Sequence, residues 1–181
     1  MVSTTARAAR GSPHSNQCLV EFDRNMSAPS FKLRPALPAD AETLTRIAHD
    51  AKRHWGYPEH WIQHWHADLT VSPDYLTHNA VFVAEQEGEA IAFYALVIKD
   101  GKAELDHLWV APTHIGTGVG KALFVHAMQD AAAREISEVQ ISSDPNAEGF
   151  YSKMGAYRIG ETISEIDGQR RSLPLMNVKP G

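Results

Sequence analysis

Cysteine is nearly absent from this chain of 181 residues: Cys18 is the only one, so no internal disulfide can form. This scarcity is typical of a reducing compartment, and we expect a cytoplasmic protein. No apolar run approaches the roughly 18 residues of a membrane span, so no membrane partner is expected. Positive charge is also scarce. The net charge of −5, from 17 Lys and Arg against 22 Asp and Glu, disfavours a nucleic-acid partner bound through its phosphates.

Residues 1–30 differ in composition from the rest of the chain. They are rich in Ser, Thr, Ala and Arg, contain no acidic residue before Glu21, and follow neither a helical nor a strand period. Targeting peptides share this composition, but no amphipathic stripe of arginines can be drawn. We therefore expect a disordered extension, or a true start at Met26, followed by one domain over residues 31–181.

Beyond Phe31 the hydrophobic pattern becomes regular and predicts a sheet with helices packed on it. Alternation and apolar runs predict strands at 31–36, 80–86, 90–98, 102–110, 138–142, 157–164 and 172–178. Helical spacing predicts helices near 41–54, 58–69, 120–134 and 145–154, with a short helix or loop at 72–79. The order predicts an α/β (α+β three-layer) fold with a mixed sheet of about seven strands.

The most informative segment is Val110–Phe124, where a strand pattern passes into a helical pattern through a loop containing three glycines. Such a junction presents free backbone N–H groups to an anion, and glycine lets the backbone approach it closely. A Walker A loop would need glycine at 115 and Ser or Thr at 122, where the chain has Ile115 and Ala122. A dinucleotide fingerprint would need glycine at Lys121.

The segment Ile115–Gly120 resembles the acyl-CoA loop R/Q-x-x-G-x-G/A of the GNAT superfamily of N-acetyltransferases. Ile115 departs from the Arg/Gln position, but the family binds pyrophosphate largely through backbone amides there. Residues 145–157, PNAEGFYSKMGAY, resemble the family's second conserved segment, and residues 34–47 resemble its opening strand and helix. The chain from about 31 to 178 is therefore identified as a member of this superfamily, which implies acetyl-CoA as the co-substrate and no metal.

The resemblance also implies which residues contact acetyl-CoA. The glycine loop would hold the pyrophosphate, and the backbone of the preceding strand would polarise the thioester carbonyl. The cofactor-binding residues implied in this way are Leu108, Trp109, Val110, Ile115, Gly116, Thr117, Gly118, Val119, Gly120, Lys121, Asn146 and Phe150.

Attack of an amine on a thioester needs a group that takes the amine's proton and a group that protonates the departing thiolate. Tyr151 matches the family tyrosine near the CoA sulfur, so the resemblance makes it the acid. Glu104 stands at the offset from the glycine loop where some family members carry their general base. By strand period Asp106 shares the face of Glu104, together with Leu108 and Val110, and is the second candidate base.

On the opposite face of that strand we expect His107, packed with Leu105 and Trp109. His60 and His64 stand at i, i+4, a spacing that can bind metal on a helix, but no third ligand follows and we expect no metal site.

The segment His54–His66 is rich in histidine and tryptophan. In GNAT folds the loop between the first two helices covers the acceptor pocket, so the resemblance implies that His54, Trp55 and Tyr57 contact the acceptor. Near the end of the chain, one of Arg170 and Arg171 is a candidate for contact with an acidic acceptor or a partner subunit.

The sequence therefore predicts an N-acetyltransferase that moves the acetyl group of acetyl-CoA to a primary amine by direct attack. No acetyl-enzyme is expected, because no Ser–His or Cys–His motif offers a nucleophile. A small-molecule acceptor is favoured. A protein lysine or N-terminus as acceptor, and a non-catalytic acyl-CoA-binding domain, stay open as alternatives. Because family members often pair, a homodimer is expected.

Overall fold

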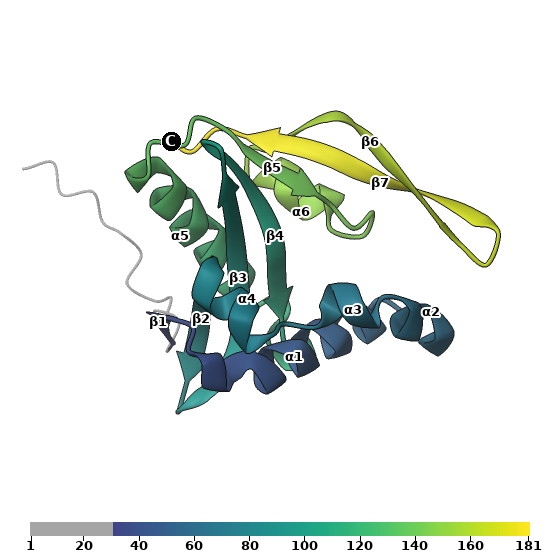
Figure 1. The fold of residues 1–181 in the computed structure, drawn as a ribbon, viewed down its shortest axis with the longest axis horizontal. Coiled ribbons are helices and arrows are strands. Elements are labelled where there is room, and N and C mark those ends of the chain that lie inside the picture. Colours follow the sequence, from purple (N-terminus) through teal and green to yellow (C-terminus); the bar gives the residue numbers. More distant parts are fainter. Residues whose placement is uncertain (1–30) are drawn as a thin grey trace, which may run out of the picture.

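A seven-stranded sheet forms the middle layer of residues 31–181, the part of the chain that this computed structural model describes (Figure 1). The strand order is β1-β2-β3-β4-β5-β7-β6, and all neighbouring strands in it are antiparallel except β4 and β5. The strands are β1 (Lys32–Pro35), β2 (Ala80–Gln86), β3 (Glu89–Lys99), β4 (Lys102–Val110), β5 (Val139–Ser142), β6 (Tyr157–Ile166) and β7 (Gln169–Val178). The predicted extension, with Cys18 and Met26, lies outside the described residues.

Helices cover both faces of this sheet and complete three layers. One face carries α1 (Ala41–His54), α2 (Glu59–His64), α3 (His66–Leu69) and α4 (Pro73–His78). The other carries α5 (Val119–Ala133) and α6 (Glu148–Lys153), and short 3-10 turns lie at Pro38–Asp40 and Pro112–His114. Among residues 31–181, no helix combines the length and apolar content that crossing a bilayer requires.

The two helical layers explain why β3 is almost continuously apolar. Phe93 and Tyr94 are both fully buried but point to opposite faces of the sheet. Phe93 packs with Leu44 on the α1 side, and Tyr94 packs with Leu123 on the α5 side. A strand covered on both faces needs apolar residues at every position, not at every second one.

The predicted fold class is confirmed, and the elements depart from the predicted ranges by more than one residue chiefly in three places. The β6–β7 strands are longer because Asp167 and Gly168 both take positive φ (52° and 71°), which permits a two-residue turn. The helix expected over 58–69 is divided into α2 and α3 at Trp65, whose ψ of 10° departs from helical geometry. The helix expected from 145 starts at Glu148, because Asp144 accepts a hydrogen bond from the Asn146 amide and turns the chain first.

A β-bulge at Asp106 changes which residues of β4 share a face. The residues on either side of Asp106 pair with successive residues of β3, so Asp106 itself has no partner there. The extra residue shifts the side-chain alternation by one. Leu105 consequently packs on the α5 side with Leu108 and Val110, and the prediction that Glu104 shares their face is wrong.

The parallel strands β4 and β5 separate toward their carboxyl ends. They pair only at Ala103 with Val139 and at Glu104 with Gln140, and beyond that point they diverge (Figure 1). From residue 105 to 110, no strand within residues 31–181 pairs with the β5-facing edge of β4. Openings at the carboxyl ends of parallel strands are the usual ligand sites of such sheets.

Candidate active site

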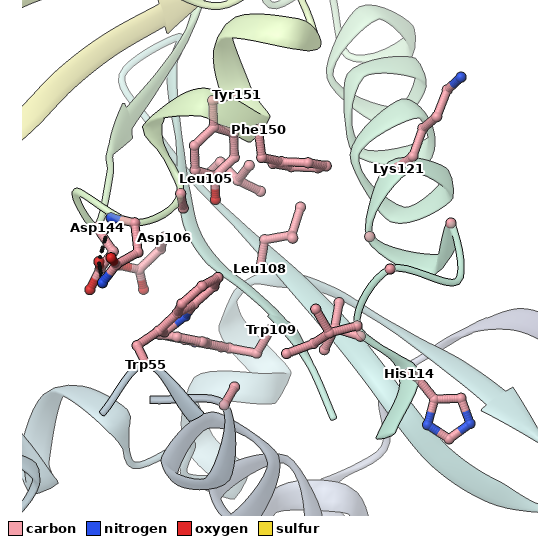
Figure 2. Close-up of a pocket in the computed structure, with 18 of the residues that line it drawn as sticks. Trp55, Leu105, Asp106, Leu108, Trp109, His114, Lys121, Asp144, Phe150 and Tyr151 are labelled. Carbon is pink, nitrogen blue, oxygen red and sulfur yellow. Dashed lines mark hydrogen bonds between the residues drawn. The ribbon is translucent and has the colours of Figure 1, made fainter. Parts of the chain in front are cut away.

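A cavity of about 410 Å³ occupies the opening between β4 and β5. Its walls come from β4, the loop before α5, the turn and helix after β5, and the end of α1 (Figure 2). The lining residues are Ala51, Trp55, Leu105, Asp106, Leu108, Trp109, Val110, His114, Ile115, Gly116, Gly118, Gly120, Lys121, Ser142, Asp144, Asn146, Ala147, Phe150 and Tyr151.

The glycine loop forms one end of this cavity. Gly116 and Gly118 have φ of 84° and 91°, a conformation that side chains other than glycine disfavour, and open space surrounds both. Within residues 31–181, no acceptor is hydrogen-bonded to the backbone amides of Gly116 or of residues 118–121, at the positive end of the 15-residue helix α5. Unpaired amides converging at a helix N-terminus fit the pyrophosphate of CoA.

The side chains of the loop contribute less than its backbone. Ile115 is 37% exposed and lines the cavity, whereas Val119 is buried in the core. Thr117 does not line the cavity, and its hydroxyl donates to the His114 carbonyl at 2.7 Å. Lys121 lies at the rim, and Figure 2 shows its side chain directed away from the other labelled residues.

Tyr151, on α6, directs its hydroxyl toward the middle of the cavity (Figure 2). Its ring is buried against Phe124 and Phe150, with centroid separations of 6.0 and 5.2 Å. Burial, reinforced by the charge of Asp144, raises the pKa of this phenol, so it stays protonated at neutral pH. No other residue in the described part of the chain hydrogen-bonds the hydroxyl. Tyr151 is therefore an available proton donor.

Asp106, the bulge residue, lines the same cavity, and two neighbouring side chains fix the position of its carboxylate. The Tyr75 hydroxyl donates to Asp106 Oδ2 at 2.5 Å, and His107 Nε2 lies 3.6 Å from the same oxygen. The Trp109 indole donates to His107 Nδ1 at 2.9 Å, which leaves the imidazole proton on Nε2. Burial lowers the pKa of His107, so the ring is neutral. The arrangement presents an oriented carboxylate at the cavity wall.

Glu104 lies outside the cavity. One of its carboxylate oxygens accepts a hydrogen bond from the Ser142 hydroxyl at 3.3 Å. Its side chain lines a separate surface hollow near the β3–β4 turn, together with Lys99, Lys102 and Glu138. The bulge at Asp106 accounts for this separation, because it assigns the two acidic side chains to different surroundings.

Asp144, directly after β5, is a cavity residue that the sequence reasoning missed. Lys52 Nζ lies 2.5 Å from Oδ2, the Tyr57 hydroxyl donates to Oδ1 at 3.0 Å, and the amide of Asn146 donates to Oδ1 at 2.9 Å. Burial opposes the charged carboxylate, but Lys52 and these hydrogen bonds outweigh it and lower the pKa of Asp144. Its position at the carboxyl end of a strand parallel to β4 was the available signal.

Tyr57, Trp61 and Trp65 form an aromatic cluster behind Asp144. Lys52 Nζ lies 4.9 and 4.5 Å from the ring centroids of Tyr57 and Trp65. The guanidinium of Arg171, on β7, contacts all three rings, and its Nη2 donates to the Tyr57 hydroxyl at 3.1 Å. The cluster thus joins the N-terminal helices to the β6–β7 hairpin.

Residues 42–156 match the model of the acetyltransferase (GNAT) family. This chain belongs to the GNAT acetyltransferase family. A curated relative, N-acetyltransferase family 8 member 3 of Mus musculus, is 29% identical over 141 residues, covering 71% of this chain and 62% of that protein. The chain therefore spans less than two thirds of the length of this family member.

Solved GNAT structures share the fold. The GCN5-related N-acetyltransferase from Rhodopseudomonas palustris has a TM-score of 0.71 at 22% identity, covering 85% of this chain and 98% of that one. The PaiA N-acetyltransferase from Thermoplasma acidophilum, solved in complex with coenzyme A, has a TM-score of 0.64 at 24% identity, covering 83% and 99%.

Most residues that the GNAT resemblance implied lie around the cavity between β4 and β5. Of the catalytic candidates, Asp106 and Tyr151 line it and Glu104 does not; of the acceptor candidates, only Trp55 does. Tyr57 does not line the cavity but donates a hydrogen bond to Asp144, which does. The His54 ring contacts the Trp55 ring edge-on. The cofactor candidates that line the cavity are Leu108, Trp109, Val110, Ile115, Gly116, Gly118, Gly120, Lys121, Asn146 and Phe150.

Proposed function

We propose that this GNAT chain transfers the acetyl group of acetyl-CoA to the primary amine of a small molecule, without an acetyl-enzyme. The proposal rests on one observation. The same cavity is lined at one end by the glycine loop, where the amides of Gly116 and of residues 118–121 have no acceptor within residues 31–181, and farther along by the Tyr151 hydroxyl and the Asp106 carboxylate. The CoA complex of the structurally similar PaiA enzyme supports the choice of co-substrate.

When bound, acetyl-CoA supplies the thioester, whose C–S bond breaks as the amine forms the new C–N bond. The backbone N–H groups of Leu108 and Val110 hold the thioester carbonyl. In the antiparallel ladder they point away from β3, as the bond from the Ala111 amide to the Ile91 carbonyl indicates, and no strand of residues 31–181 pairs with that edge at these two residues. Asp106 accepts the proton that the amine loses. Tyr151 donates its proton to the departing sulfur, and exchange with solvent restores both side chains.

We assign the base to Asp106 and not to Glu104. Asp106 lines the cavity, and its Tyr75 hydrogen bond orients the carboxylate without filling the cavity side. Glu104 is outside, bonded to Ser142. A base must come within hydrogen-bond reach of the proton that it takes, directly or through one water molecule, and this criterion favours the side chain in the cavity wall.

A small acceptor is favoured because α2 and the β6–β7 hairpin are joined beside the cavity. The Trp61 indole donates to the Asp167 carboxylate at 2.9 Å, and His60 Nε2 lies 2.9 Å from the same oxygen. An extended peptide would need an open channel between these elements. These contacts leave access for a compact amine.

Calorimetric titration with acetyl-CoA, followed by an amine screen that detects released CoA thiol, tests the proposal. We expect micromolar binding of acetyl-CoA and turnover of at least one small amine. Asp106→Asn should lower kcat/KM about 100-fold, whereas Glu104→Gln should stay within about twofold of wild type. Equal losses in the two variants would refute the base assignment. Absence of acetyl-CoA binding by the folded protein would refute the function.

A further inference from the structure

Arg171 is held by aromatic rings, and no acidic side chain of residues 31–181 pairs with it. Its guanidinium carbon lies 5.0, 5.4 and 4.6 Å from the ring centroids of Tyr57, Trp61 and Trp65, within the range of cation–π attraction. Among residues 31–181, no Asp or Glu forms an ion pair with Arg171, and its one hydrogen bond goes to the Tyr57 hydroxyl. Contact with three rings and the hydrogen bond to Tyr57 restrain the guanidinium, so little conformational entropy is lost when a ligand binds.

Of the two cations in the aromatic cluster, only Lys52 forms an ion pair with an Asp or Glu of residues 31–181. Lys52 and Arg171 both lie against Tyr57 and Trp65, while Asp144 is the carboxylate bonded to this group and pairs with Lys52. The other nearby acid, Asp167, is half exposed and bonds to Trp61 and His60. The guanidinium of Arg171 is part-buried and, among residues 31–181, is not paired directly with a carboxylate, so a carboxylate of a ligand that reaches it would be attracted more strongly than in bulk water.

The unpaired charge is close to the cavity. Arg171 Nη2 donates to the Tyr57 hydroxyl, which in turn donates to Asp144 in the cavity wall, so two hydrogen bonds connect Arg171 to the lining. Figure 2 shows Asp144 across the cavity from Lys121 and His114, which flank the glycine loop. Arg171 thus stands at the end away from the amides that fit the CoA pyrophosphate.

From this arrangement we propose that the acceptor is an amino acid, and that Arg171 binds its carboxylate while the amine enters the cavity. The inference rests on the proposed acetyl transfer and narrows it to one acceptor class. A guanidinium presents paired N–H donors that match a carboxylate in a bidentate geometry, and no acceptor of residues 31–181 is hydrogen-bonded to Nε or Nη1 of Arg171. A purely cationic amine would gain nothing from the guanidinium and would be repelled by its charge.

Three acceptors that share one side chain isolate the carboxylate: L-phenylalanine, L-phenylalaninamide and 2-phenylethylamine. An aromatic side chain suits the apolar lining of Trp55, Leu108 and Trp109. We would measure kcat/KM for each acceptor with wild type and with Arg171→Gln. The ratio of acid to amide in the variant, divided by the same ratio in wild type, cancels the different basicities of the amines.

We expect wild type to favour phenylalanine over 2-phenylethylamine, and Arg171→Gln to lower the acid-to-amide ratio about 10- to 100-fold, the loss of a charge-assisted hydrogen bond. Arg171→Lys keeps the charge and loses the paired donors, so its acid-to-amide ratio should lie between those of wild type and Arg171→Gln. Arg170→Gln is the matched control, because Arg170 is exposed on the same strand and the substitution removes an equal charge. The acid-to-amide ratio of this variant should equal that of wild type.

The outcomes separate this proposal from the function on which it rests. If no amine in any screen is acetylated, the proposed function fails. If wild type acetylates 2-phenylethylamine as well as phenylalanine, or if Arg171→Gln and Arg170→Gln have the same ratio, the carboxylate proposal is wrong while acetyl transfer stands. Acetyl-CoA affinity measured on each variant should match wild type, which shows that the fold and the cofactor end are intact.

Discussion

The ion pair between Lys52 and Asp144 offers a sharp test of the energetics beside the cavity. Only 11% and 10% of the two side-chain surfaces are exposed, and Nζ lies 2.5 Å from Oδ2. Asp144→Asn keeps the shape of the side chain and an acceptor oxygen but removes the charge. Lys52 would then be a buried cation held only by that amide oxygen and the surrounding rings.

Removing one partner of a buried ion pair costs about 3–5 kcal/mol, because the other charge is left uncompensated. The cation–π contacts of Lys52 persist in the variant, each worth about 0.5–1 kcal/mol, which places the expected loss near the lower end. We therefore predict that Asp144→Asn lowers the free energy of unfolding by about 3 kcal/mol. For a domain of this size that corresponds to a fall in Tm of about 6–12 °C.

Urea denaturation at pH 7, followed by circular dichroism, measures this loss. Combining Asp144→Asn with Lys52→Met should destabilise the protein by at least about 2 kcal/mol less than the sum of the two single variants, since the double variant leaves no unpaired charge. Glu59→Gln is the control: Glu59 pairs with Arg53 at 2.9 Å, but 56% and 45% of these side chains are exposed, so the loss should stay below about 1 kcal/mol. A loss below about 1 kcal/mol for Asp144→Asn, or strict additivity, would refute the reasoning.

Three further predictions concern acidity, leaving-group protonation and the glycine loop. Because the folded pKa of Asp144 is lowered, its contribution to stability is full above its unfolded pKa near 3.8 and is lost as pH falls through the folded pKa, so wild type should lose more stability than Asp144→Asn in unfolding titrations below about pH 4. Tyr151→Phe should lower kcat about 10- to 100-fold without changing the calorimetric Kd of acetyl-CoA; a changed Kd with constant kcat would make Tyr151 a binding residue. Gly118→Val should weaken acetyl-CoA binding at least about tenfold, whereas Gly88→Val, which meets the same positive φ (87° against 91°) in the β2–β3 turn, should cost stability and leave that Kd unchanged.

Local sequence pattern was sufficient to predict much of the fold and one end of the candidate site. The apolar run of β3 and the amphipathic spacing of α1 involve residues close together in the chain, so the hydrophobic pattern alone locates both elements. The glycine loop is equally local, because positive φ at Gly116 and Gly118 and the amides that follow belong to one continuous segment. The role of Tyr151 was predicted from the resemblance of residues 145–157 to the second conserved GNAT segment.

The acceptor end depended on tertiary structure, because its contacts join residues far apart in the chain. Lys52 and Asp144 are 92 positions apart, and Arg171 and Tyr57 are 114 apart. The bulge at Asp106 is likewise invisible to a strict period of two, yet it separates Asp106 from Glu104 and decides which carboxylate lines the cavity. Hydrophobic period and turn chemistry determine elements one at a time, whereas strand register and the pairing of buried charges exist only once the elements have packed together.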